Sequence, residues 1–143
     1  GSVMVNVAHA LKVHVESHQL GVLVAHASFA LFLNPPTVRG PDVAFVSHER
    51  MPKNAFDLSY WRLSPDLAVE ILSPSNHPRL MAEKVADYLE AGSSLVWVID
   101  PDRRNVIVHA PGKDPVEHDS DAVIDGGAVL PDLRLPVGKF FEY

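Results

Sequence analysis

The chain contains no cysteine, which excludes disulfide bonds and metal sites built on thiolates. It also has no apolar run near the roughly 20 residues that a membrane-spanning helix needs, and no signal-peptide pattern. Positive charge is scarce, because 12 Lys and Arg against 18 Asp and Glu give a formal net charge of -6. That balance argues against a general polyanion binder. These absences favour a cytoplasmic protein with no membrane partner.

What is present is enough for a folded domain. The chain has 143 residues, of which 47% are hydrophobic, so it is the size of one ordinary domain with a real core. Residues 3–17 predict a helix, because Val7, Leu11 and Val15 recur at helical spacing. Gly1 and Ser2 have the look of an expression scar, so we expect the natural chain to start earlier.

The rest of the pattern is a series of short strands interrupted by one helix. We expect strands at 22–33 (as one strand or a bent pair), 42–46, 66–72, 95–100 and 106–110, and a helix at 78–91. Residues 34–40 should form a loop, and residues 112–127 a loop with a weak strand. Ser75 or Asn76 is the expected N-cap of that helix, and Gly92 its C-terminal stop. The apolar tail should dock on the core. The order α, several β, α, ββ is typical of an α+β fold.

A carboxylate lies in the middle of an apolar strand. In "PDLAVEILSPSN" the strand residues are hydrophobic except Glu70, and an unpaired buried carboxylate is costly. Consecutive strands often pair, and antiparallel pairing of 42–46 with 66–72 would put Asp42 beside Glu70. Asp66 points to the same face as Glu70 but lies about 13 Å away along the strand. Asp42 and Glu70 could therefore share one ion, whereas Asp66 and Glu70 could not.

The following helix can add a lysine to this pair. Lys84 lies within the apolar stripe that includes Met81, Val85 and Tyr88, so we expect it to point toward the sheet or along its edge. Two carboxylates suit a hard divalent ion such as Mg²⁺. Such an ion polarises a phosphodiester and activates water, while a lysine positions the water and offsets developing negative charge.

Each of these residues also has a structural interpretation. Asp42 could cap a strand start, and Glu70 could form a plain ion pair with Lys84. Lys84 could equally be a surface lysine whose stem lies along apolar surface. Asp66 is expected to hold a loop by accepting hydrogen bonds from backbone N–H groups.

Histidines and aromatic residues raise two further questions. His14 and His18 are one helical turn apart, but a zinc site needs a third ligand at a defined spacing, and the sequence offers none. Tyr60 and Trp61 could stack on nucleic-acid bases, although packing in the core or in a dimer is the commoner use of such residues.

Four stretches together carry a family resemblance. "RGPDVAFV", "PDLAVEILSPS", "EKVADYLEAG" and "LVWVIDPDRRNVIVH" resemble the Uma-type family of putative restriction endonucleases, a family of unknown function within the PD-(D/E)xK nuclease-like superfamily. The resemblance covers nearly the whole chain. It implies a restriction-endonuclease-like fold, with a mixed central sheet flanked by helices. The expected domain is a single one over residues 1–143, truncated at its N-terminus within the first helix.

The resemblance assigns roles to three residues. Asp42, after Pro41, matches the first acid of the superfamily pattern, and Glu70 matches the second. Leu72 occupies the usual lysine position, and Lys84 matches the place to which the lysine has moved in similar proteins. The family often has an acid where this chain has Leu80, and another acid where it reads His26-Ala27.

The implied activity is metal-dependent hydrolysis of DNA phosphodiester bonds. Asp42 and Glu70 would hold Mg²⁺ or Mn²⁺, and Lys84 would assist the attacking water. The partner would be nucleic acid, in the first place DNA, and a homodimer would supply two sites for cutting both strands of a duplex. The alternative is a catalytically inactive relative that keeps the fold and serves as a binding or assembly module.

Overall fold

The computed structural model describes residues 1–57 and 60–143. The helices and strands follow one another in the order α1 (Ser2–Ser17), β1 (Gly21–Ala25), β2 (Phe29–Leu33), β3 (Pro36–Arg39), β4 (Val43–Ser47), η1 (Ala55–Asp57), β5 (Leu67–Ile71), α2 (Pro78–Ala91), β6 (Leu95–Asp100), β7 (Asn105–His109), β8 (Val116–His118), β9 (Val123–Gly126), β10 (Leu130–Pro136) and η2 (Val137–Phe141). No helix within the described residues is long and apolar enough to cross a membrane.

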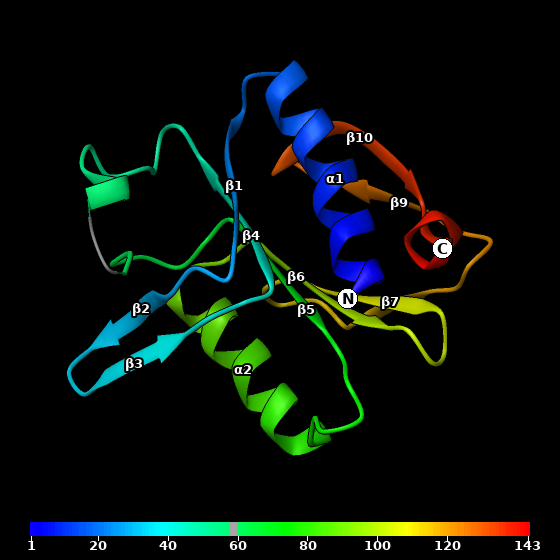
Figure 1. Cartoon of the computed structure of the whole chain (residues 1–143). Helices are drawn as coiled ribbons and strands as arrows, with labels where there is room; N and C mark the ends of the chain where they lie inside the picture. Colours follow the sequence, from blue (N-terminus) through cyan, green and yellow to red (C-terminus); the bar gives the residue numbers. More distant parts are fainter. Residues whose placement is uncertain (58–59) are drawn as a thin grey trace.

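A mixed six-stranded sheet forms the centre of the fold. Its strand order is β1-β4-β5-β6-β7-β8, and β5 and β6 are the parallel pair, joined by α2. The two long helices lie on opposite faces of this sheet, as Figure 1 shows. The α+β class and the mixed sheet flanked by helices agree with the sequence-based expectation, and the fold therefore has two separate helix–sheet interfaces.

Side chains of β5 alternate between the two interfaces because successive residues of a strand point to opposite faces. Leu67 and Val69 are buried in the cluster that includes the apolar face of α1. Ala68 is buried in the second cluster, against α2, and Glu70 shares its face by alternation. The period of two thus sends the carboxylate toward α2 and leaves the α1 core fully apolar.

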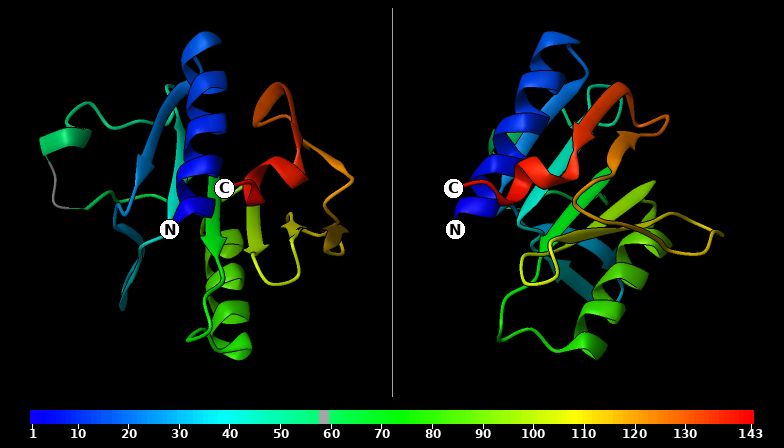
Figure 2. Two further views of the ribbon diagram at one scale, coloured as in Figure 1. Left: turned by 45° about the vertical axis from the view of Figure 1, so that its right-hand side comes forward. Right: turned by 90° about the vertical axis from the view of Figure 1, so that its right-hand side faces the viewer.

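The C-terminal part of the chain covers the free side of α1 (Figure 2). The short β9–β10 sheet and η2 contribute Ile124, Leu133 and Phe140 to the α1 core. The Asn6 side-chain amide donates a hydrogen bond to the Phe140 carbonyl oxygen at 3.0 Å, which ties η2 to α1. The expectation that the apolar tail docks on the core is confirmed.

The segment 22–33 is a bent pair of strands. β1 joins the six-stranded sheet at its edge, whereas β2 leaves it and forms a separate hairpin with β3. The expectation of a loop at 34–40 was wrong, because β3 pairs with β2 over part of it. Two prolines hid this strand, although Thr37 and Val38 are β-branched residues that favour one.

Helix α2 has the predicted bounds but a different N-cap. The cap is His77, whose Nδ1 accepts a hydrogen bond from the backbone N–H of Arg79 at 3.1 Å. Asn76 instead closes the turn after β5, by accepting from the backbone N–H of Ser73 at 2.6 Å. Gly92 ends the helix in the left-handed region with φ of 119°, as expected of a glycine in this position.

Candidate active site

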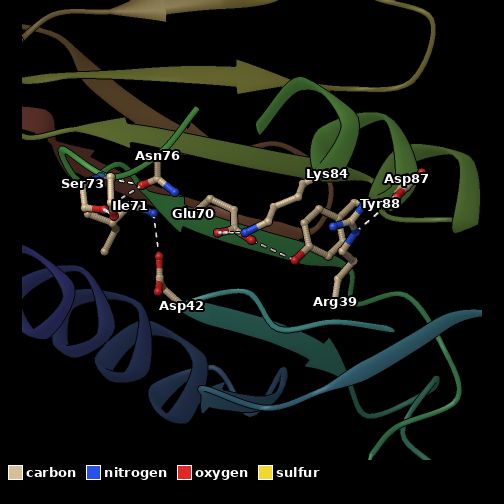
Figure 3. Close-up of polar contacts among 10 residues, drawn as sticks. Arg39, Asp42, Glu70, Ile71, Ser73, Asn76, Lys84, Asp87 and Tyr88 are labelled. Carbon is tan, nitrogen blue, oxygen red and sulfur yellow. Dashed lines mark hydrogen bonds and ion pairs between the residues drawn. The ribbon is translucent and has the colours of Figure 1, made fainter. Parts of the chain in front are cut away.

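The pairing of β4 with β5 decides where Asp42 lies. The strands are antiparallel, with Val43 opposite Val69, so Asp42, one residue before β4, faces Glu70. The expected meeting of Asp42 and Glu70 depends on this antiparallel arrangement. The Asp42 Oδ2 atom accepts a hydrogen bond from the backbone N–H of Ile71 at 2.7 Å (Figure 3). The carboxylate of Asp42 is thereby fixed against the end of β5.

Glu70 is a buried carboxylate, with only 5% of its side chain exposed. Its Oε1 atom accepts a hydrogen bond from the hydroxyl of Tyr88 at 2.9 Å. Desolvation raises the pKa of Glu70 above its usual value of 4.5, and the negative charge of Asp42 raises it further. The Tyr88 hydrogen bond and the positive charge of Lys84 lower this pKa, but burial has the largest effect. The site therefore disfavours the charged form that it would need for binding a cation.

Lys84 approaches the other oxygen of the same carboxylate. Its Nζ lies 4.0 Å from Glu70 Oε2, and 31% of its side chain is exposed. Lys84 and Tyr88 are one helical turn apart, so α2 presents both toward Glu70 from the same face (Figure 3). The structure thus contains the Glu70–Lys84 ion pair that the sequence suggested, at a separation longer than a hydrogen bond.

The three predicted residues line one cavity of about 570 Å³. Its wall also includes the turn after β5, the N-terminal end of α1, and residues before β4, among them Ser73, Asn76, Met4, His26 and Gly40. Within the described residues, Asp42 Oδ1 and Glu70 Oε2 accept no hydrogen bond. Each acid therefore has one oxygen held by the protein and one left available.

Sequence reasoning missed two contacts of this site. Tyr88 was taken as part of an apolar stripe, and helical spacing gave no sign that its hydroxyl meets Glu70. Arg39 of β3 donates from Nε and Nη2 to Asp87 Oδ2 on α2, at 3.2 and 2.8 Å. Because β3 was expected to be a loop, nothing in the sequence placed Arg39 near this helix.

The other predicted residues lie away from the cavity. Asp66 Oδ2 accepts from the backbone N–H of Ser47 at 2.7 Å, which is the structural role expected of it. Trp61 is buried against Phe29 in the core. His14 and His18 stack with ring centroids 4.1 Å apart. Over residues 1–57 and 60–143, no three His, Asp or Glu side chains converge to hold a metal ion.

Comparisons with known proteins agree with this architecture. A family model described as "Putative restriction endonuclease" (Uma2) matches residues 1–138. No curated protein matches significantly. The structure is similar to the crystal structure of a putative nuclease of the DUF820 family from Anabaena variabilis. The TM-score is 0.86 at 21% sequence identity, over 98% of this chain and 78% of that one.

At this identity the structural likeness shows the fold alone, while the family match extends over nearly the whole chain. The match includes Asp42, the strand β5 that carries Glu70, and the helix α2 that carries Lys84. Taken together, fold and match identify the chain as a member of the Uma2 family of putative restriction endonucleases.

Proposed function

We propose that the protein is a metal-dependent nuclease that hydrolyses phosphodiester bonds of DNA at the cavity lined by Asp42, Glu70 and Lys84. One observation carries the proposal. Two carboxylates from paired strands and one ammonium group from α2 border the same cavity, and each carboxylate keeps one oxygen available. Membership of a family of putative restriction endonucleases supports nucleic acid as the substrate class.

The donor set fits Mg²⁺ or Mn²⁺. Mg²⁺ is usually bound by one or two carboxylates together with waters and substrate phosphate oxygens, so two acids are sufficient. Burial raises the pKa of Glu70 by removing its carboxylate from water, and the positive charge of Lys84, 4.0 Å away, offsets this effect only in part. A divalent cation held by the carboxylates of Asp42 and Glu70 would supply positive charge that offsets the burial of Glu70. When bound, such an ion polarises a phosphodiester and lowers the pKa of a water molecule.

The protein's own groups prepare the site for this chemistry. The Ile71 N–H holds Asp42 and the Tyr88 hydroxyl holds Glu70, so neither carboxylate has to reorganise when substrate arrives. Lys84 is half-buried beside Glu70, where its ammonium group can donate a hydrogen bond to the attacking water. The same positive charge offsets the negative charge that develops on the phosphate oxygens.

A homodimer is part of the proposal. Each chain offers one such cavity, and cutting both strands of a duplex requires two active sites. The formal net charge of -6 argues against a general attraction to DNA, so DNA binding would depend on local contacts near the cavity.

The alternative is a non-catalytic relative that acts as a binding or assembly module. One observation favours it: the helix position at which the family often has an acid is Leu80, whose side chain is 57% exposed. In that case the Glu70–Lys84 pair would serve only to compensate a buried charge.

Nicking of supercoiled plasmid with Mg²⁺ or Mn²⁺ tests the proposal. We expect cleavage by the wild type, loss of cleavage in Asp42→Ala and Glu70→Ala, and no change in Glu90→Gln, an exposed acid on α2. Calorimetric titration should show Mn²⁺ binding by the wild type and by Glu90→Gln, and loss of binding in Asp42→Ala and Glu70→Ala. Cleavage that persists undiminished in both alanine variants would refute the site, and absence of both cleavage and metal binding would support the alternative.

A further inference from the structure

The hydroxyl of Tyr88 has a single polar contact within the described part of the chain. Tyr88 is fully buried, among Ala68, Met81, Val85 and other apolar residues of the α2 cluster. A phenylalanine ring would fill that apolar space equally well. The hydroxyl meets Glu70 Oε1 at 2.9 Å, so what distinguishes tyrosine here is one hydrogen bond to a buried carboxylate.

Two side chains of α2 lie next to different oxygens of the Glu70 carboxylate. Tyr88 holds Oε1, while Lys84 lies 4.0 Å from Oε2, on the cavity side. Rotation about the last side-chain bond of a glutamate is soft, so a carboxylate without a fixed partner turns readily. Without the hydroxyl, Glu70 could turn both oxygens toward Lys84 and close the ion pair.

The backbone of Tyr88 is itself held in place. The Ser64 hydroxyl donates to the Tyr88 carbonyl oxygen at 3.1 Å, and the Ser93 hydroxyl donates to the Pro65 carbonyl oxygen at 2.6 Å. Both serines are buried, so this network fixes the end of α2 against the segment that leads into β5. The phenol ring therefore approaches Glu70 from a rigid support.

The surroundings of Tyr88 favour the protonated form of its hydroxyl. Burial raises the pKa of Tyr88 far above its usual value, and the negative charge of Glu70 adds to this effect. Because an ionised carboxylate can only accept, the Tyr88 hydroxyl is the donor in this hydrogen bond.

We propose that Tyr88 is a positioning residue that keeps Glu70 Oε2 open toward the cavity and apart from Lys84, and so makes Glu70 available as a cation ligand. This inference rests on the proposed metal site of Asp42 and Glu70 and adds a residue to it. Groups that orient a metal ligand typically account for a tenfold to hundredfold difference in metal affinity.

Calorimetric titration of Mn²⁺ without nucleic acid is the test. We expect Tyr88→Phe to bind Mn²⁺ about 10- to 100-fold more weakly than the wild type. The matched control is Tyr60→Phe, which removes a hydroxyl whose contact is Arg62 at 3.4 Å, away from the cavity. In the Glu70→Gln background, Tyr88→Phe should cause no additional loss.

A rescue distinguishes positioning from a general structural role. If Tyr88→Phe weakens binding because Glu70 closes on Lys84, then Lys84→Met in the same chain should restore Mn²⁺ affinity toward that of Lys84→Met alone. A proton NMR titration of the wild type adds a measurement that depends on no variant. The Tyr88 hydroxyl proton, shielded from solvent, should shift when Mg²⁺ is added.

The outcomes separate this inference from the proposed function. Mn²⁺ binding that depends on Glu70 but is unchanged in Tyr88→Phe would overturn the positioning role and leave the metal site standing. A Tyr88 hydroxyl resonance unmoved by saturating Mg²⁺ would overturn it equally. If the wild type binds neither ion, the proposed site fails and the positioning role fails with it.

Discussion

The two ends of the β4–β5 strand pair carry the same aspartate hydrogen bond in different surroundings. At one end Asp66 accepts from the backbone N–H of Ser47, and at the other Asp42 accepts from the backbone N–H of Ile71, both at 2.7 Å. The second oxygen of Asp66 is paired with Arg50 at 3.1 Å. The second oxygen of Asp42 has no such partner among the described residues and lies at the cavity.

This difference separates a structural acid from a candidate functional one. Asp66 is fully compensated by the protein, which is the usual state of a half-buried carboxylate. Asp42 adds its negative charge to that of Glu70, and the nearest cation to this pair of acids is Lys84, 4.0 Å from Glu70. Incomplete charge compensation in a cavity is a common property of active sites.

The largest expected effect comes from exchanging each aspartate for asparagine, which keeps the hydrogen bond and removes the charge. Asp42→Asn should reduce metal-dependent plasmid nicking at least about 100-fold, because a direct ligand outweighs an outer partner. Asp66→Asn should stay within about twofold of the wild type once folded. Initial nicking rates at matched protein and Mn²⁺ concentrations measure both. If both variants lost the same share of the nicking rate, Asp42 would have no functional role that Asp66 lacks.

Lys84 gives the next largest effect. Lys84→Met should lower the nicking rate about 100-fold, since a group that assists proton transfer or charge stabilisation typically contributes that much. Mn²⁺ affinity should be retained or improved, because a positive charge leaves the neighbourhood of Glu70. Arg79→Met, an exposed cation on the same helix, is the control. Loss of Mn²⁺ binding in Lys84→Met would indicate that the lysine supports the fold of the site instead.

The order of the two aspartates should reverse when stability is measured, because the substitution of Asp66 should destabilise the fold more than the substitution of Asp42. Asp66→Ala removes a backbone hydrogen bond and the Arg50 ion pair of a side chain that is 13% exposed, so we expect the free energy of unfolding to fall by about 1.5–3 kcal/mol. Asp42→Asn should remain within about 0.5 kcal/mol of the wild type, because it also relieves repulsion with Glu70. Urea denaturation measures both. A larger loss in Asp42→Asn would make Asp42 the structural acid.

The smallest effect concerns the pH dependence of stability in EDTA-treated protein. Because the pKa of Glu70 is raised in the folded state, its contribution is fully favourable below the usual value of 4.5 and is lost as pH rises through the folded pKa. Glu70→Gln should therefore be more stable than the wild type at neutral pH, with a difference that shrinks toward pH 4. A difference independent of pH would show that Glu70 does not titrate between the two conditions.

Much of the site follows from local sequence patterns. The apolar run around Glu70 predicted a buried strand. If that strand pairs antiparallel with the strand before it, as the structure shows, Asp42 lies opposite Glu70. Helix α2 was predicted with its observed bounds, because its apolar stripe and the αL glycine at Gly92 are strong local signals. The strand and the helix depend on residues close together in the chain, whereas the pairing joins two consecutive strands.

Contacts between elements far apart in the chain could not be predicted from the sequence. The Arg39–Asp87 ion pair joins β3 to α2, and it required a hairpin that two prolines concealed. Tyr88 looked like an ordinary core residue, since a helical stripe shows which residues face the sheet but not which polar atom they meet there. His77 caps α2 where a serine or asparagine was expected, because Asn76 is used in the preceding turn.

The sequence by itself determined the class of fold, the strand that carries Glu70 and the face of that strand, because these depend on the periods of two and 3.6 residues. Only the tertiary structure decided that Tyr88 holds one oxygen of Glu70 while Lys84 stands apart from the other. That arrangement depends on how α2 is seated on the sheet. Its position comes from packing and from buried hydrogen bonds between segments far apart in the chain, which no local pattern records.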